Sequence, residues 1–316
     1  MINIYDKIKP IKSRSNYLCD FLCNAYKLQD TIDIQYIDAT LHNSQKQVFD
    51  LENNFTFVIP VKIDSNERKF NLNCVIDFIY NNFINFKIIV SEQAEQQTIF
   101  SNSKFDVFYK KNTSRFFKTK CVNDAAHLIK TEFGCMYDAD HIATPTAFYQ
   151  CFKKLKEGYN FAHPSTGMNI YFNKHHTNIF ATQKKLPLQN QVTYQRFFEP
   201  AFYPGLCFMF NTSEYFEVGL ENENFITWGM EDHERFIRIE KLEKSIYYTP
   251  ACGYHLWHPR NTDYYYKVVF KSDQFYDEFT NEDHVNELNK INNFNKSQLT
   301  DYISTWSWNK KAPLNH

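Results

Sequence analysis

Two aspartates, Asp138 and Asp140, follow a short apolar segment that begins at Phe133. In a strand, side chains alternate between two faces, so both carboxylates should leave the end of this segment on the same side. Like charges this close repel each other. A divalent cation, alone or with a diphosphate, would relieve the repulsion beyond the strand end, where open α/β sheets bind ligands. Asp-x-Asp is also common in surface turns, so alone it is weak evidence for a metal site.

A second pair of possible metal ligands is His255 and His258, in the segment 253–260. An extended chain would place these rings on different faces, whereas a turn or one helical step brings residues three apart together. A single histidine would be interpreted as a polar residue with its hydrogen bonds satisfied. Two histidines, in a chain that already offers two clustered aspartates, predict a His/His/Asp metal site.

Carboxylates also gather where a loop enters a helix, in a segment that reads Trp228-Gly-Met-Glu-Asp-His-Glu-Arg-Phe-Ile-Arg238. Helical spacing is indicated by Phe236, Ile239 and Leu242. Acidic residues in a first turn stabilise the positive end of the helix dipole. A purely structural capping role therefore explains these carboxylates as well as a chemical role does.

Alternating strands and helices must position these groups. Residues 55–61 are apolar and stop at Lys62, residues 68–82 have apolar side chains at helical spacing, and residues 86–90 form a second apolar run. This strand-helix-strand order predicts a parallel pair whose carboxyl ends meet on the ligand-binding rim.

Further elements extend this unit. Residues 123–130 predict a short helix, and Thr144-Pro145 begins another helix that ends at Gly158. The order β-α-β-α-β-α is that of a nucleotide-binding half-sheet, here without a Gly-x-Gly-x-x-Gly or Walker-type loop. The segment 202–210 is apolar and predicts a strand interrupted at Pro204-Gly205, where glycine would let backbone approach a ligand closely.

Two segments allow more than one interpretation. Residues 101–123 are rich in lysine and predict either a solvated loop or a contact of Lys118 or Lys120 with pyrophosphate. Residues 161–200 show no clear pattern and are interpreted as a long excursion, either an active-site lid or a disordered loop.

Composition limits the class of protein. A chain of 316 residues, 43% hydrophobic, can form one large domain with extensions. Its net charge of -1 argues against a general nucleic-acid binder, which needs a basic surplus. No segment is apolar for long enough to cross a bilayer, and residues 1–12 lack a signal-peptide core. We therefore expect a cytoplasmic protein, or one that rests on a membrane surface.

Domain boundaries and cysteine chemistry complete this prediction. We expect an N-terminal helical extension over 1–50, with an amphipathic helix at 15–28, a central domain over 51–270, and a C-terminal helical extension over 271–316. The tail of this last extension docks either on the domain, which is the default expectation, or on a partner or membrane surface. The 8 cysteines include no Cys-x-x-Cys pair, which indicates reduced, buried thiols.

Taken in order, the motifs resemble those of GT-A glycosyltransferases of the β-1,4-galactosyltransferase and related bacterial capsule-glycosyltransferase group, over roughly residues 55–262. Residues 58–61 and 88–93 resemble the two nucleotide-binding strands. Asp138-Ala139-Asp140 resembles the family's Asp-x-Asp, Trp228-Gly-Met-Glu-Asp232 resembles its Trp-Gly-Gly-Glu-Asp acceptor motif, and His255-x-x-His258 resembles its later metal-ligand segment.

The resemblance implies an α/β fold with a Rossmann-like, mixed and mainly parallel central sheet flanked by helices. It implies a glycosyltransferase that moves a hexose or N-acetylhexosamine from a UDP-sugar to a hydroxyl of a glycan acceptor, in surface polysaccharide or glycoconjugate synthesis. The cofactor would be Mn2+ or Mg2+, held by Asp140, His255 and His258.

The same resemblance assigns roles to further residues. Asp232 would accept the acceptor's proton, Glu231 would orient the acceptor sugar, and Trp228 would provide a stacking platform. The contacts of the nucleotide or its cofactor would come from strand ends and motif residues: Pro60, Val61, Lys62, Asp64, Glu92, Lys120, Asp138 and Trp228. Attack from the face opposite the nucleotide would invert the anomeric carbon.

Three positions depart from the family pattern. Met230 stands in place of a glycine, His255 in place of the methionine of the animal enzymes, and Lys62 in place of their arginine. An imidazole ligand should broaden tolerance toward Mg2+. Three alternatives remain open: a retaining enzyme like the polypeptide GalNAc-transferases, which have Asn at the position of Asp232; a hydrolase; and an inactive binding or scaffold protein.

Overall fold

The computed structural model describes residues 47–113, 115–165, 168–183, 195–198, 205–226, 230–249, 251, 253–259, 268–271, 274–277 and 281–310. Nearly all of the predicted N-terminal extension, including its helix at 15–28, lies outside these residues, and so does Trp228. Those predictions are not tested by the structure.

A mixed sheet forms the centre of the described structure. Its strands are β2 (Phe55–Val61), β4 (Lys87–Ala94), β5 (Asp106–Lys111), β6 (Phe133–Tyr137), β8 (Phe161–His163), β11 (Cys207–Asn211) and β12 (Ile246–Tyr248). They form a 7-stranded sheet in the order β12-β8-β11-β6-β2-β4-β5. Neighbouring strands are parallel, except that β11 runs antiparallel to both β6 and β8. The predicted mixed, mainly parallel sheet is therefore confirmed.

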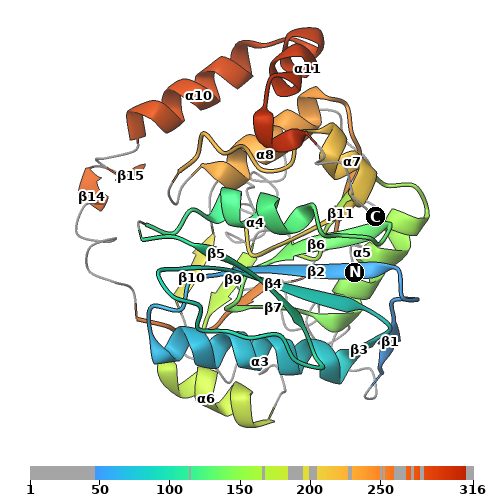
Figure 1. Cartoon of the computed structure of the whole chain (residues 1–316), viewed down its shortest axis with the longest axis vertical. Coiled ribbons are helices and arrows are strands. Elements are labelled where there is room, and N and C mark those ends of the chain that lie inside the picture. The colour runs from blue at the N-terminus through green and yellow to red at the C-terminus, as the bar shows by residue number, and fades with distance from the viewer. Residues whose placement is uncertain are drawn as a thin grey trace, which may run out of the picture.

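The alternation of side chains along these strands produces one core on each face of the sheet. Phe57 of β2 packs with α3 (Asn66–Asn82) and α5 (Pro145–Lys156), and its ring stacks on Phe148 with centroids 5.2 Å apart. Phe208 of β11 packs on the other face with α4 (Lys118–Ala126) and α8 (Glu231–Lys241). In Figure 1, α3 lies below the sheet, and α4 and α8 lie above it.

A second, smaller sheet joins distant parts of the sequence. Its strands β7 (His141–Ala143), β9 (Met168–Tyr171), β10 (Gln195–Phe198) and β13 (Gly253–His255) have the order β10-β9-β13-β7. The antiparallel pair β13-β7 sets His255 opposite His141. This pairing brings the chain around residue 255 to the end of β6, because β7 begins only four residues after β6 ends.

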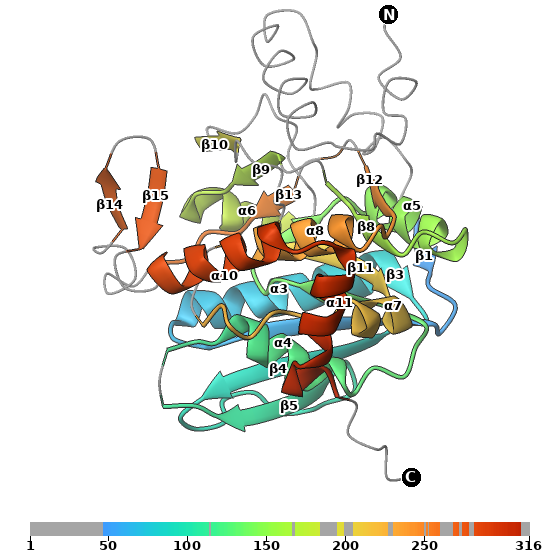
Figure 2. The same ribbon diagram turned by 90° about the horizontal axis from the view of Figure 1, so that it is seen from above.

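The C-terminal helices α10 (Asn281–Asn293) and α11 (Lys296–Ser304), followed by the 3-10 turn η3 (Ser307–Asn309), dock on the domain as expected. They lie on the same side of the sheet as α8 (Figure 1 and Figure 2). Leu299, Ile303 and Trp306 are buried in the same core as Ile239 of α8. The predicted domain boundary between 270 and 271 falls within β14 (Val268–Lys271), which pairs with β15 (Gln274–Asp277).

One alternative for residues 101–123 is wrong, because this segment is not simply a solvated loop. It contains β5 at the edge of the sheet and the start of α4, which begins at Lys118 rather than at residue 123. An edge strand tolerates charged side chains on its open side, so the hydrophobic pattern that identifies central strands is weak there.

The remaining described elements are short. They are β1 (Phe49–Asp50), β3 (Phe83–Ile84), α6 (Lys174–Gln183) and α7 (Thr212–Glu217). The five described cysteines that are assigned as free, Cys74, Cys121, Cys135, Cys151 and Cys207, are all buried, in line with the prediction of reduced thiols. Among the described helices, none combines the length and the hydropathy that spanning a bilayer requires.

Candidate active site

Asp140 lies beyond the carboxyl end of β6, and two histidines converge on it. The His258 Nε2 atom is 3.2 Å from Oδ2 of Asp140, and the His255 Nε2 atom is 3.6 Å from Oδ1. One possible ligand atom from each residue lies within 4.8 Å of the other two. We call Asp140, His255 and His258 the carboxylate-histidine cluster. The sequence-based prediction that these three residues come together is confirmed.

Backbone contacts fix the two histidines. After β13 ends at His255, the Leu256 amide donates to the Asp140 carbonyl at 2.7 Å. The carbonyl of Trp257 then accepts from Asn71 of α3 at 3.0 Å. His258 donates from Nδ1 to the Pro259 carbonyl at 2.9 Å, which turns Nε2 toward Asp140. The fold therefore positions both histidines around Asp140.

An arginine shares the Asp140 carboxylate. The Arg68 Nη1 atom lies 3.3 Å from Oδ2 of Asp140, and its Nε atom lies 3.1 Å from Asp64, which follows β2. Burial by itself would raise the pKa of Asp140, but His255, His258 and Arg68 lower it, and the net shift is downward. Asp140 is therefore an anion that can bind a cation at neutral pH.

The donor set fits a divalent first-row metal ion such as manganese. One carboxylate and two imidazoles suit ions that accept oxygen and nitrogen ligands. A six-coordinate ion held by three side chains keeps positions for oxygens of a diphosphate or water. The fit rests on the chemistry and convergence of the donors within the described residues.

Lys118, and not Lys120, lies beside Asp138. Its Nζ atom is 2.9 Å from Oδ1 of Asp138. Burial would lower the pKa of Lys118, but the carboxylates of Asp138, Asp232 and Glu231 raise it well above its usual value. One ammonium group thus faces both the Asp-x-Asp strand end and the first turn of α8. Burial raises the pKa of Asp138, and the Lys118 charge only partly opposes this rise.

Asp232 lies in the first turn of α8 and is 20% exposed. Its Oδ1 atom accepts from the Nη2 group of Arg235 at 2.5 Å. A Cβ atom added to Gly205 would lie 2.5 Å from Oδ2, so a side chain at this position would have to displace that oxygen. In this structure the close approach of Gly205 is to the Asp232 carboxylate, and its approach to a ligand stays a prediction.

Met230 immediately precedes α8 and has a left-handed backbone, with φ of 67°. A non-glycine residue pays a steric cost in this region, because Cβ approaches the following carbonyl. This conformation gives a physical reason for the glycine at this position in the resembling family. Glu231, the next residue, is buried.

Other predicted nucleotide contacts have partners within the chain. Glu92 accepts from the Thr98 amide at 3.1 Å and from the Ile99 amide at 3.2 Å. Lys120 is paired with Glu223 at 3.1 Å. Their roles at the site stay predictions.

The end of β2 is placed as predicted. Pro60 and Val61 are the last two residues of the strand and are buried. Lys62 and Asp64 follow on the same rim as Asp140. Arg68 connects Asp64 with Asp140, because it pairs with both carboxylates. Their contacts with a nucleotide stay predictions as well.

Arg68, His163 and Arg235 were not predicted from the sequence as residues of the site. Arg68 offered a signal, because a cation in the first turn of a helix opposes the helix dipole and so needs another reason. His163 is buried, donates from Nε2 to the Gly205 carbonyl at 3.3 Å and accepts at Nδ1 from the Ser165 amide at 3.2 Å. The spacing of Asp232 and Arg235, three residues apart in a helix, was a readable ion-pair pattern.

This chain resembles known proteins in its fold, and only at low sequence identity. The sequence matches no protein-family model and no curated protein. The fold is similar to that of the catalytic domain of Drosophila β1,4-galactosyltransferase 7 with xylobiose, at a TM-score of 0.38 and 13% identity over 64% of this chain and 65% of that chain. A mutant of that enzyme with manganese, UDP-Gal and xylobiose gives a TM-score of 0.39 and 12% identity over the same shares.

A third similar structure is the mannosyltransferase PcManGT from Pyrobaculum calidifontis, in complex with GDP-Man and Mn2+. It matches at a TM-score of 0.42 and 12% identity, over 79% of this chain and 71% of that chain. The chain spans slightly less than two thirds of the length of the galactosyltransferase chains. At these scores and identities the likeness does not itself assign an activity.

Proposed function

We propose that this protein is a metal-dependent glycosyltransferase that moves a hexose or N-acetylhexosamine from a UDP-sugar to a hydroxyl of a glycan acceptor. One observation carries the proposal. The carboxylate-histidine cluster lies at the carboxyl end of β6, where Lys118 pairs with Asp138, and the charge of Lys118 also interacts with those of Asp232 and Glu231 of α8. A cation site and a carboxylate base thus face the same small region, as transfer from a sugar diphosphate requires.

The reaction would proceed as one displacement. The acceptor hydroxyl gives its proton to Asp232 while its oxygen forms the bond to the anomeric carbon. The bond from that carbon to the diphosphate oxygen breaks, and the electron pair leaves with the UDP. A cation held by Asp140, His255 and His258 would stabilise the charge that develops on the diphosphate. A single displacement inverts the anomeric configuration.

The neighbouring side chains have supporting roles in this proposal. Lys118 adds positive charge next to Asp138, and Asp138 would contact the ribose or ordered water. Arg68, placed between Asp64 and Asp140, would exchange its carboxylate contact for the diphosphate when a metal ion takes over Asp140. Glu231 would orient the acceptor sugar. Pro60, Val61, Lys62 and Asp64 would line the nucleotide side.

The test is release of UDP from a panel of UDP-sugars with Mn2+, in the presence and absence of glycan acceptors. We expect acceptor-dependent release by the wild type, loss of release in Asp140→Ala and Asp232→Asn, and UDP binding retained in Asp232→Asn. A wild-type protein that neither binds UDP nor releases it contradicts the proposal.

The same assay separates the alternatives. A hydrolase would release free sugar without an acceptor. A binding or scaffold protein would bind UDP-sugar without turnover. NMR of the product decides between inversion and the retained configuration of a GalNAc-transferase-like enzyme.

A further inference from the structure

Asp232 is held by a completely buried arginine. Arg235 is 0% exposed, and its Nη1 group donates to Oε2 of Glu221 at 2.7 Å while its Nη2 group contacts Asp232. Taking such charges out of water is expensive, and apolar residues of similar volume commonly stabilise a fold as well or better. A buried ion pair that ends at a partly exposed carboxylate therefore needs a reason other than stability.

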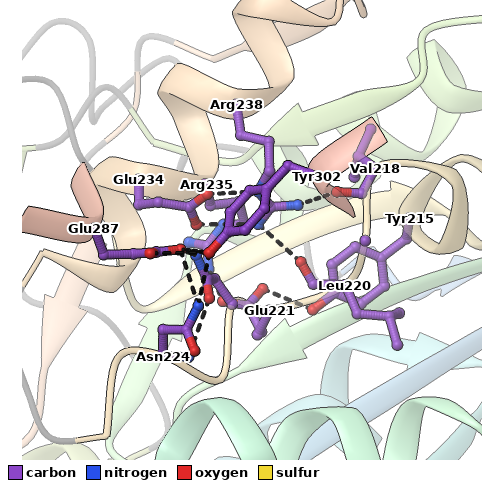
Figure 3. Close-up of polar contacts among 12 residues, drawn as sticks. Tyr215, Val218, Leu220, Glu221, Asn224, Glu234, Arg235, Arg238, Glu287 and Tyr302 are labelled. Atoms are coloured by element: carbon purple, nitrogen blue, oxygen red, sulfur yellow. Dashed lines mark hydrogen bonds and ion pairs between the residues drawn. The ribbon is translucent and has the colours of Figure 1, made fainter. Parts of the chain in front are cut away.

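Glu221 is itself fixed from several directions. The Tyr215 hydroxyl donates to Oε1 at 2.6 Å, and the Glu221 backbone is paired in both directions with the Asn123 side chain from α4. The Arg235 guanidinium also lies 4.5 Å from the Phe208 ring centroid. Figure 3 shows Arg235 pointing from α8 toward Glu221 and Tyr215. The guanidinium has little freedom to move, so its position is imposed by β11, α4 and α7.

The two oxygens of Asp232 have different surroundings. Oδ1 is bonded to Arg235, whereas Oδ2 lies against Gly205, where a side chain would not fit. We propose that Arg235 is the positioning residue for the proton acceptor: by holding Oδ1, it presents Oδ2 of Asp232 to the acceptor hydroxyl. This inference rests on the proposed function, in which Asp232 is the base. The proton of the acceptor would then reside on Oδ2 after the transfer.

A second buried arginine on the same helix provides a matched control. Arg238 is also 0% exposed, but it donates to Glu234 at 2.6 Å and to the carbonyls of Val218 and Leu220. These contacts, drawn in Figure 3, hold residues 218–220 directly after α7, and none of them involves Asp232. We call Glu221, Glu234, Arg235 and Arg238 the arginine network. Only one of its arginines should affect the base.

Charge at Asp232 offers an independent readout. Burial raises the pKa of Asp232, whereas Arg235 and Lys118 lower it, and the net shift is downward. The other charged or titratable groups facing it are Asp138 beyond β6, His163 of β8 and Glu231 of α8. Removal of the Arg235 charge should therefore shift the acidic limb of the kcat profile toward higher pH, by about one pH unit.

The experiment compares Arg235→Met, Arg235→Lys and Arg238→Met in UDP release with Mn2+ and acceptor. For Arg235→Met we expect kcat to fall by about 10- to 100-fold with the KM for UDP-sugar unchanged. The acidic limb of its kcat–pH profile should move to higher pH. Arg235→Lys should lower kcat but leave the limb near its wild-type place, because it keeps the charge and loses the geometry. Arg238→Met should keep the wild-type limb.

A double-mutant cycle covers the case of poor folding. Asp232→Asn is combined with Arg235→Lys and, separately, with Arg238→Lys, and the unfolding equilibrium constant is measured without substrate. We expect coupling of at least about tenfold for the first pair and none for the second.

Superimposable pH profiles and equal coupling for the two arginines would overturn the inference. The proposed function fails separately, through a wild type without transfer or a fully active Asp232→Asn variant.

Discussion

The carboxylate-histidine cluster and the arginine network are both buried groups of charge, but they are completed in different ways. In the cluster, one carboxylate is shared by two imidazoles and Arg68, all at 3.2 to 3.6 Å. In the network, each arginine has its own buried carboxylate, at 2.7 Å for Glu221 and 2.6 Å for Glu234. The network is therefore complete within the chain, whereas the cluster is chemically ready for a cation. Changes to the cluster should affect binding and activity. In the network, changes to Arg238 and Glu234 should affect stability, whereas changes to Arg235, which also holds Asp232, should affect activity as well.

The largest expected effect is in the cluster. Asp140→Asn removes the charge that two histidines cannot replace, so we expect transfer to fall by about 1000-fold and Mn2+ binding to be lost in isothermal titration. The melting temperature should fall less than in Arg238→Met, because Asp140 lies beyond the end of β6 and outside the two apolar cores. Asp77→Asn, which breaks a surface ion pair with Lys104, is the control and should keep full activity. A large loss of stability in Asp140→Asn would remove the distinction between the two regions.

The network should show the opposite behaviour. Arg238→Met leaves Glu234 buried without its partner, and we expect a loss of about 3 to 5 kcal/mol in the free energy of unfolding. The double variant Glu234→Gln with Arg238→Met should recover much of this loss, because no charge then stays buried alone. Urea denaturation measures both. A double variant as unstable as the single one would mean that packing, and not charge, dominates at this position.

Acid should destabilise the protein through His163, which is buried in its neutral form. Burial lowers the pKa of His163 to about 4, from an ordinary value of 6.5. Between these values the unfolded chain binds a proton that the folded chain does not, so stability falls as pH falls from 6.5 to 4, by about 3 kcal/mol at most. His163→Gln keeps a donor for Gly205 and removes the titration. Its unfolding free energy should depend less on pH in this window, and identical slopes would contradict the assignment.

Gly205→Ala should impair the proposed base, Asp232, without affecting the proposed cation site. The new methyl group would meet Oδ2 of Asp232 and displace it, so we expect kcat to fall by about tenfold or more while UDP and Mn2+ still bind. Gly158→Ala is the matched glycine control, because nothing lies within 4 Å of its Cβ position and its φ of 99° makes the cost one of stability. Equal activity of the two variants would argue against a role for Oδ2.

The smallest effect concerns the entry to α8. Met230 has φ of 67°, so Met230→Gly should stabilise the protein by up to about 1 kcal/mol through relief of this strain, reduced by the greater freedom of glycine in the unfolded chain. Met230→Ala keeps the strain and should not stabilise. Thermal unfolding of the two variants gives the comparison.

The parts of the fold that were predictable are those where one pattern dominates. Phe55–Val61 and Phe133–Tyr137 are apolar runs that end in polar residues, so the strands and the acidic rim followed directly from the sequence. The convergence of His255 and His258 on Asp140 followed from motif order and residue chemistry.

What could not be predicted depends on helix register and long-range pairing. Because α4 begins at Lys118, five residues before the predicted start, the choice between Lys118 and Lys120 could not be made from composition, and the two side chains point to different partners. Similarly, capping of the helix dipole already accounted for the carboxylates in the first turn of α8, so there was no sequence-based reason to look for Arg235 as their partner. Its second partner, Glu221, precedes it by 14 residues, beyond the reach of local pattern rules.

The position of Trp306 has a consequence for biosynthesis. Its ring lies 5.2 Å from the Arg238 guanidinium and against Gly219, and the Trp308 indole donates to the Gly219 carbonyl. The ribosome delivers the chain from its N-terminus, so β2, β6 and the histidines emerge well before these tryptophans. During translation, the core around Arg238 and Gly219 therefore stays incomplete until residues 306–308 have been added.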